Sequence, residues 1–318
     1  MAADDNQGMS PALPADLSSV LSSNLPQGAV RLLDWGVIRA QGAEAAKFLH
    51  GQLTQDVEHL EDGQVKLAGY CSVKGRLLAS FVMWRRGPDE VLLACSADLL
   101  PAVLKRLSMF VMRAKCKLSD ASAELPLWGL AGAAVNALAA AADGGQVLRL
   151  HDAVVDGGTL SRALWVGPAE PAAPALDGDA WRWLEVHSGV ARIVAATSEQ
   201  FVPQMVNLEL VGGVNFQKGC YPGQEIVARS QYRGTLKRRA YVLESAVPLQ
   251  PGQEVFLASE AEQPAGMVAL AGSWAGRHAG LVELKIAALA AGTLHAGSAG
   301  GPLLTVAQLP YAIPADAT

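Results

Sequence analysis

Cysteine is scarce in this sequence, and its few residues do not form a metal-binding pattern. Cys71, Cys95, Cys116 and Cys220 show neither a CxxC nor a Cys-x-x-His spacing. A structural zinc site and an iron–sulfur cluster held by this chain alone are therefore not expected. The first three lie in apolar surroundings and are predicted to be buried, reduced thiols. The histidines show no paired spacing either, so no metal site is predicted.

Several motifs and targeting signals are also missing. The sequence has no GxxxxGK[ST], GxGxxG, HExxH or GxSxG motif, and no apolar run reaches the roughly 18–20 residues of a membrane span. The N-terminus lacks the basic and apolar regions of a secretory signal and is not rich in arginine. We therefore expect a cytoplasmic protein that has no membrane partner.

Positive charge is in the minority, with 25 Lys and Arg against 30 Asp and Glu and a net charge of −5. This balance argues against broad binding to phosphate backbones, so no stable nucleic-acid complex is expected. One stretch departs from the average, because it places five basic residues close together: Arg229, Arg233, Lys237, Arg238 and Arg239. Two interpretations stay open, a solvated start of a strand or a basic rim for an anionic ligand or partner.

What the sequence does contain is the pattern of a globular α+β protein, with 51% hydrophobic and 17% charged residues. Residues 1–24 are polar and predict a flexible tail. Residues 25–236 alternate strand and helix patterns, which predicts antiparallel sheets with helices on one face. Residues 237–318 contain short strand patterns between Gly- and Pro-rich turns and no convincing helix, which predicts a small β-barrel or sandwich.

The individual elements follow from the periodicity of apolar residues. Asp98 is predicted to cap the helix that follows it, and Asp179 to open another. Strands are predicted in residues 29–40 (two around a turn), 66–71, 76–84, 90–95, 112–118, 239–244, 254–258, 266–270, 279–286 and 303–306, and helices in residues 42–53, 100–111, 133–142 and after 179.

The segment richest in chemistry is KGCYPGQE, residues 218–225. Gly219, Pro222 and Gly223 favour a turn-rich backbone, which brings N–H groups close to a ligand. Lys218 lies two residues from Cys220, and a nearby ammonium favours a thiolate. Cys220 is therefore the one cysteine with a reason to be reactive.

The other side chains of this segment suit the recognition of a ring. Tyr221 offers a face for stacking, and Gln224 and Glu225 can form paired hydrogen bonds with the edge of a heterocycle. The alternative is an ordinary surface turn with a half-buried cysteine.

KGCYPGQE resembles the signature of the YgfZ-type folate-binding proteins, bacterial relatives of the aminomethyltransferase (GcvT, the T-protein) of the glycine cleavage system. Four further elements resemble the family in the same order. They are FLHGQLTQD at residues 48–56, KGR at 74–76, FVPQMVNL at 201–208, and VAR at 227–229 with KRR at 237–239. The similarity runs from about residue 30 to beyond residue 240.

This resemblance implies two α+β subdomains and a C-terminal β-barrel around a central cavity that accepts a tetrahydrofolate. It also implies a role in assembling or repairing iron–sulfur enzymes, including those that thiomethylate tRNA. Cys220 would be the reactive or transiently ligating thiol, with Lys218 as its activator. The residues implied in cofactor binding are Gly219, Tyr221, Gly223, Gln224, Glu225, Asn207 and Arg229. The partners would be folate and iron–sulfur client enzymes or assembly proteins.

The sequence departs from the aminomethyltransferases at one strand. Those enzymes carry adjacent aspartates just after its glycine, whereas this chain has Leu78 and Ala79. Neither side chain can move a proton, so glycine-cleavage activity is not expected. Two alternatives stay open: a one-carbon transferase that uses another substrate, and an interaction module whose cavity is vestigial.

Overall fold

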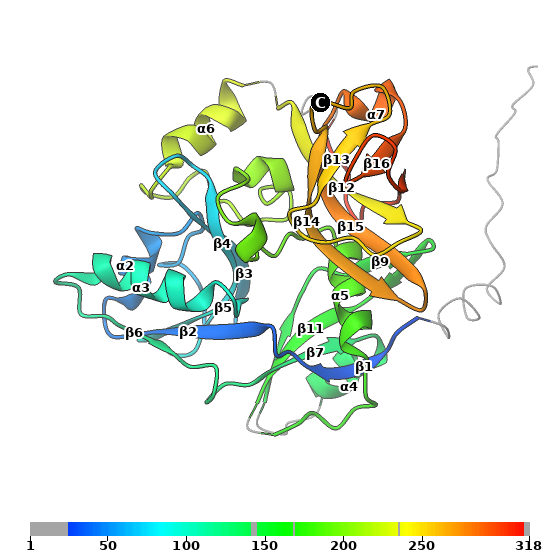
Figure 1. Ribbon diagram of the computed structural model, residues 1–318. Helices are drawn as coiled ribbons and strands as arrows, with labels where there is room; N and C mark the ends of the chain where they lie inside the picture. The colour runs from blue at the N-terminus through cyan, green and yellow to red at the C-terminus, as the bar shows by residue number, and fades with distance from the viewer. Residues whose placement is uncertain (1–24, 141–144, 168, 235, 315–318) are drawn as a thin grey trace, which may run out of the picture.

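The computed structural model describes residues 25–140, 145–167, 169–234 and 236–314. The tail predicted at residues 1–24 lies outside them. Figure 1 shows three parts arranged around a common centre: a five-stranded sheet, a four-stranded sheet and a barrel. The α+β class and the C-terminal barrel predicted from the sequence are thereby confirmed.

The five-stranded sheet is antiparallel and has the order β3-β4-β5-β2-β6. Its central strand β5 is buried from Val91 to Ser96, a continuous run that is typical of a strand covered on both faces. Helices α2 and α3 pack against β5 and β2, respectively. The bounds are β2 (Trp35–Gln41), β3 (Val65–Cys71), β4 (Leu77–Arg85), β5 (Glu90–Ser96), β6 (Lys117–Asp120), α2 (Ala45–His50) and α3 (Leu100–Val111).

The four-stranded sheet has the order β1-β7-β11-β8, and helix α5 lies between it and the barrel. Both Trp181 and Trp183 of α5 are buried, because the helix contacts β1 on one side and β14 and β15 on the other. The bounds are β1 (Gly28–Arg31), β7 (Leu127–Ala131), α4 (Ala133–Ala140), β8 (Gln146–Arg149), the hairpin β9 (Ala153–Val155) and β10 (Gly158–Leu160), β11 (Arg162–Val166) and α5 (Gly178–His187).

The barrel is closed in the order β12-β15-β14-β13-β16-β17. Its first strand begins at Arg238, next to the predicted boundary between residues 236 and 237, which stays a prediction. The bounds are β12 (Arg238–Ser245), β13 (Glu254–Leu257), β14 (Gly266–Trp274), β15 (Arg277–Lys285), β16 (Leu294–Ala296) and β17 (Leu303–Val306). A one-turn helix, α7 (Ala288–Ala291), and strand β16 belong to this part, although the turn-rich sequence indicated neither.

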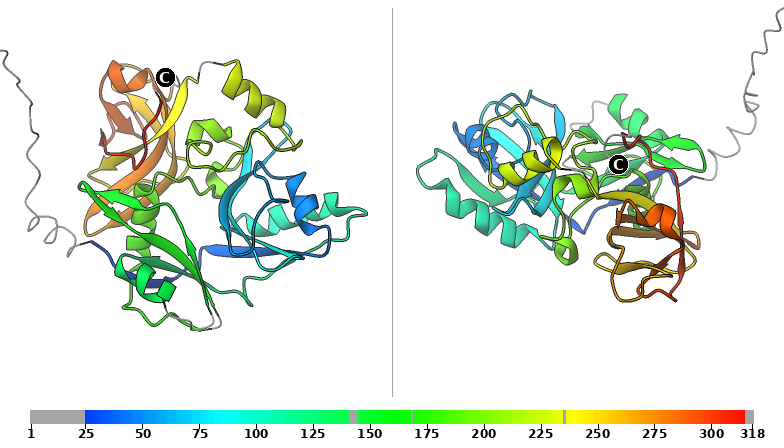
Figure 2. Two further views of the ribbon diagram at one scale, coloured as in Figure 1. Left: turned by 180° about the vertical axis from the view of Figure 1, so that it is seen from behind. Right: turned by 90° about the horizontal axis from the view of Figure 1, so that it is seen from above.

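Between α5 and the barrel, residues 188–223 are irregular except for the 3-10 turns η1 (Ala195–Thr197) and η2 (Pro203–Val206). This segment leads into helix α6 (Gln224–Tyr232), which lies beyond the β3–β4 end of the five-stranded sheet (Figure 2). The sequence did not predict α6, and Gln224 and Glu225 therefore lie in its first turn rather than on a loop.

Two other local predictions were wrong. The carboxylate of Asp98 does not cap α3; it accepts a hydrogen bond from the backbone N–H of Ala195 at 2.9 Å and so holds η1. The strand predicted at residues 112–118 begins only at Lys117, because Met112 takes a left-handed conformation (φ 43°) at the end of α3.

The barrel is attached to the rest of the molecule by Arg239, whose side chain is only 1% exposed. It pairs with Glu209 and donates to the carbonyl of Gln204 at 3.0 Å. Arg238 pairs with Glu283. The interpretation of residues 229–239 as a basic rim is therefore wrong at Arg239, which is buried and paired with Glu209, whereas Arg238 is 28% exposed.

The Glu283 pair makes stability depend on pH. Burial raises the pKa of Glu283 to about 7, above its ordinary value of 4.5. The folded state thus holds the proton more tightly than the unfolded state, and this contribution is complete below about pH 4.5 and lost as the pH rises through 7. We expect the free energy of unfolding of the native protein to fall by about 3 kcal/mol more than that of Glu283→Gln across this window. Urea unfolding at several pH values measures the difference, and parallel curves would contradict it.

Candidate functional site

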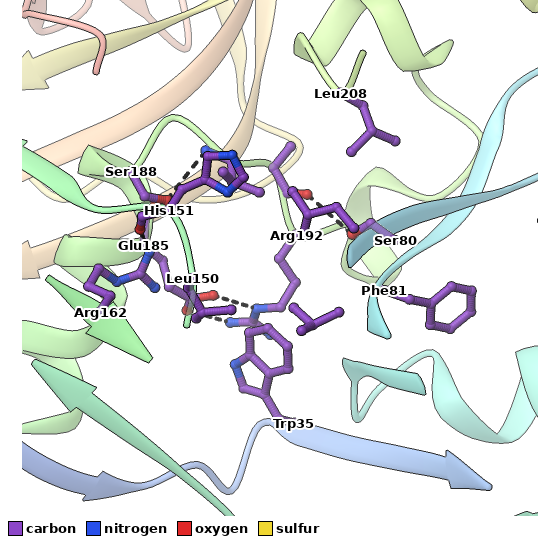
Figure 3. Close-up of a pocket in the computed structure, with 14 residues that line it drawn as sticks. Trp35, Ser80, Phe81, Leu150, His151, Arg162, Glu185, Ser188, Arg192 and Leu208 are labelled. Carbon is purple, nitrogen blue, oxygen red and sulfur yellow. Dashed lines mark hydrogen bonds and ion pairs between the residues drawn. The ribbon is translucent and has the colours of Figure 1, made fainter. Parts of the chain in front are cut away.

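A cavity lies between the two sheets, α5 and the irregular segment that follows α5 (Figure 3). The space that the centre of a water-sized sphere can occupy is about 40 Å³, and all the space between the surrounding atoms, open solvent included, is about 500 Å³. Its lining is largely apolar and aromatic, with a few charged groups. The lining residues are Trp35, Leu67, Ser80, Phe81, Val82, Leu150, His151, Arg162, Glu185, Ser188, Val190, Ala191, Arg192 and Leu208. We call this the central cavity.

The polar wall of the central cavity is organised by Arg192. Its guanidinium forms a double hydrogen bond with the carboxylate of Glu185 at 2.9 and 3.0 Å. It also pairs with Asp34 at 2.8 Å, donates to the hydroxyl of Ser96 at 3.1 Å, and lies over the ring of Trp35. Arg192 thereby connects α5 to β5 and to the start of β2.

Ser80 of β4 fastens the segment that carries Arg192 to the five-stranded sheet. Its hydroxyl donates to the carbonyl of Ala191 at 3.2 Å and accepts from the N–H of Ile193 at 2.9 Å. The side chain is buried, so both bonds form away from water. The polar position that β4 presents to the central cavity is therefore structural.

Arg162 of β11 is the second arginine of the central cavity and has few partners. It is 4% exposed, and its guanidinium lies 4.4 Å from the ring centroid of Trp181. Its one hydrogen bond to a described residue is a long contact from Nη1 to the carbonyl of His151 at 3.5 Å, and Nε has no partner. Figure 3 shows Arg162 beside Glu185, whose carboxylate is engaged by Arg192.

The segment predicted to be the working loop lies elsewhere, and we call residues 218–223 the thiol loop. Its anchor is Lys218, which is 8% exposed. The ammonium donates to the carbonyl of Leu53 at 2.8 Å and to that of His50, and it lies 5.0 Å from the ring of Tyr221. Burial lowers the pKa of Lys218 to about 8. Lys218 therefore holds the thiol loop against the end of α2.

The far end of the thiol loop packs against the turn between β3 and β4. Gly223 has φ 79°, and a Cβ there would lie 2.4 Å from the carbonyl oxygen of Ser72. Gly75 opposite has φ 71°, and a Cβ there would lie 2.8 Å from Ile226. Only glycine allows both backbones to approach so closely. The segments with KGR and KGCYPGQE thus meet in space.

Of the thiol loop's side chains, that of Cys220 is exposed and that of Tyr221 is buried. The Asn207 side chain is fully buried and donates to the carbonyl of Ala240 at 2.8 Å and to Tyr311 at 3.2 Å. Arg229 is exposed on α6. None of the residues predicted to contact the cofactor lines the central cavity: Gly219, Tyr221, Gly223, Gln224, Glu225, Asn207 and Arg229. Their cofactor contacts stay a prediction.

Sequence reasoning missed the charged residues of the central cavity. Arg162, Glu185 and Arg192 come from separate elements and share no motif. One signal was available: Glu185 is a charged residue between the apolar residues Leu184 and Val186 of α5, and all three are buried. A charge in such a position marks a buried pair or a site.

Neither a metal-binding cluster nor a membrane-spanning helix is present among the described residues. No three His, Cys, Asp or Glu side chains among them are placed to hold a metal ion. No helix in the same part of the chain has the length and apolar character needed to cross a membrane.

Comparison with known proteins gives consistent results from sequence and structure. No family model matches the chain. The tRNA-modifying protein YgfZ of Serratia proteamaculans is 33% identical over 241 residues, which are 70% of this chain and 72% of that protein. The YgfZ protein of Escherichia coli O127:H6 is 31% identical over 250 residues, 72% of this chain and 76% of the relative.

Among solved structures, the glycine cleavage system aminomethyltransferase T from Bartonella henselae is similar, with a TM-score of 0.68. The match covers 91% of this chain and 87% of that one at 16% identity, so it shows a shared fold only. The predicted aminomethyltransferase-like fold is confirmed.

The cysteines differ sharply in their surroundings, which predicts selective alkylation. Burial raises the pKa of Cys71 and of Cys95 to about 12, and that of half-buried Cys116 to about 11. Only Cys220 is exposed. We expect iodoacetamide under native conditions to add one label quickly, at Cys220, and Cys220→Ser to abolish this fast step. Peptide mass mapping measures it, and a fast label on another cysteine would contradict it.

Proposed function

Because this chain belongs to the YgfZ family of tRNA-modifying proteins, we propose that it binds a tetrahydrofolate in the central cavity. We propose further that it is an accessory protein in assembling or repairing iron–sulfur enzymes, including those that thiomethylate tRNA. The observation that carries the first step is the central cavity itself, which combines apolar and aromatic walls with a few fixed polar groups.

The lining fits the chemistry of a reduced pterin. Trp35, Phe81 and Leu67 supply apolar surface for the ring system. The carboxylate of Glu185 can accept from the ring's N–H groups, and Arg162 supplies N–H donors. A pterin presents hydrogen-bond donors and acceptors along one edge. Glu185 can accept from the donors, and Arg162 can donate to the acceptors.

The lining favours binding over aminomethyl transfer. Glu185 is the only carboxylate among the lining residues, and both of its oxygens accept from Arg192. On β4, where the aminomethyltransferases carry aspartates, this chain has half-buried Leu78, buried Ala79 and then the structural Ser80. The other lining group that can take a proton is the imidazole of His151, which follows β8 and does not stand on β4 where the aspartates would be. Glycine-cleavage activity is therefore not proposed.

The second step of the proposal assigns the thiol chemistry to Cys220. An exposed thiol on a loop that is anchored at both ends is accessible to another protein. One thiol can supply one transient iron ligand or one sulfur-exchange step, whereas a cluster requires several ligands. Arg229 and Arg233, both exposed on or beside α6, would contact the client enzyme or assembly protein.

Filling the central cavity tests folate binding. Leu67→Trp enlarges a half-buried lining residue, whereas Leu33→Trp makes the same change at a position that is 82% exposed and outside the cavity. We expect calorimetry to show that the native protein and Leu33→Trp bind tetrahydrofolate alike. Leu67→Trp should bind about tenfold or more weakly, because the indole occupies the ring's space. No heat with the native protein, or equal affinity in all three, would defeat the proposal.

Replacing the exposed thiol tests the accessory role. In cells that lack the native protein, we expect Cys220→Ala to leave thiomethylated nucleosides of tRNA several-fold below the level that the native chain restores. Cys116→Ala is the matched control, since Cys116 is half-buried. Nucleoside mass spectrometry measures both. Full restoration by Cys220→Ala would remove the thiol from the mechanism, and stoichiometric iron and sulfide in the purified protein would show a resident cluster instead.

A further inference from the structure

We propose that Arg162 is the residue that binds an acceptor oxygen of the ligand in the central cavity. The inference rests on the proposed folate binding and deepens it, because it names the recognising group and the ligand chemistry that it selects. The ligand group that Arg162 would bind is a carbonyl or carboxylate oxygen. A folate offers one on its ring, as the 4-oxo group, and others on its glutamate tail.

The two buried arginines of the central cavity differ in their partners. Arg192 is neutralised by Glu185 and Asp34, and it also donates to Ser96. Arg162 forms no ion pair with any residue that the structure describes, and its Nε has no hydrogen bond. Burial lowers the pKa of Arg162 to about 10, so the group keeps its charge at neutral pH.

A buried charge without a partner is costly, and proteins retain one where something else supplies the partner. The face of Trp181 offsets part of this cost through a cation–π contact. It cannot satisfy the N–H groups, which lie in the plane of the guanidinium and need acceptors. An oxygen that enters the central cavity would satisfy them.

The charge of the central cavity supports the same conclusion. Its lining holds the cations Arg162 and Arg192 and the single carboxylate Glu185. Asp34, which lies outside the lining, also pairs with Arg192, so the two carboxylates balance the two arginines, but both ion pairs are made by Arg192 and none by Arg162 among the described residues. A hydrogen bond from a charged donor is roughly twice as strong as a neutral one, which favours an acceptor at this position.

The first measurement compares the melting temperatures of three ligand-free proteins: the native protein, Arg162→Met and Arg192→Met. Methionine retains apolar contact and removes the charge in each. We expect Arg162→Met to melt at the native temperature or above, because it removes an unpaired charge. Arg192→Met should melt at a lower temperature, because it leaves Glu185 buried without its partner. A comparable loss in Arg162→Met would mean that Arg162 is structural, and would overturn the inference.

The second measurement is calorimetric binding of three probes: tetrahydrofolate, tetrahydropterin, which lacks the tail, and p-aminobenzoylglutamate, which lacks the pterin. We expect Arg162→Met to weaken tetrahydrofolate binding at least tenfold, and Arg162→Lys to weaken it less, since lysine keeps the charge but not the planar donors. Arg149→Met, an exposed arginine outside the cavity, is the control and should bind normally.

The probes identify the acceptor. If the native protein binds tetrahydropterin and Arg162→Met does not, the acceptor is on the ring. If the loss appears with p-aminobenzoylglutamate instead, the acceptor is a tail carboxylate, and both results support the proposal. Native-like tetrahydrofolate binding by Arg162→Met would overturn it and leave the proposed function intact. A native protein that binds none of the probes would overturn folate binding itself, and this inference with it.

Discussion

The central cavity depends on the guanidinium of Arg192. Five described groups surround that one cation: the carboxylates of Glu185 and Asp34, the Asp34 carbonyl, the hydroxyl of Ser96 and the ring of Trp35. A buried ion pair is not strongly stabilising by itself, because desolvation offsets most of the Coulomb energy. Its effect here is geometric, since satisfying every donor fixes the end of α5 relative to the five-stranded sheet. The walls of the cavity are thereby set before any ligand is bound.

The same irregular segment serves the central cavity and the thiol loop. Leu208 lines the cavity, and five residues later the carbonyl of Gly213 accepts from the hydroxyl of Thr54 at 2.6 Å. The side chain of Asn215 then accepts from the N–H of Lys218 at 3.1 Å. The exposed thiol is thus positioned by hydrogen bonds that begin at the cavity wall.

The sequence predicted the repeating elements well and the central cavity poorly, for physical reasons. Strands of the barrel were predictable because turn residues separate short apolar runs. Helix α6 was not, because it begins directly after Gly223 in a segment dominated by Gly and Pro. Neither interpretation of the basic stretch, a solvated start of a strand or a basic rim, holds at Arg239, which is buried and whose partner Glu209 lies 30 residues away in the sequence.

The predicted signature marks the thiol loop and its contact with the β3–β4 turn, since these are local motifs that meet through glycine. The cavity's charged residues have no such signature. Arg162, Glu185 and Arg192 become neighbours only when β11, α5 and the segment after it pack together. These contacts arise from the tertiary structure, and no spacing of the residues along the chain predicts them.

Tyr311, close to the end of the described chain, has a consequence for how the protein is made. Its hydroxyl donates to the carbonyl of Gly189 at 2.7 Å and accepts from the side chain of Asn207, next to cavity residues on both sides. During translation, domains form in order from the N-terminus as the chain emerges. Asn207 and Gly189 therefore gain these hydrogen bonds only after Tyr311, synthesised about a hundred residues later, has left the ribosome. The hydrogen bonds beside the central cavity are therefore completed only when the C-terminal part of the chain has been synthesised.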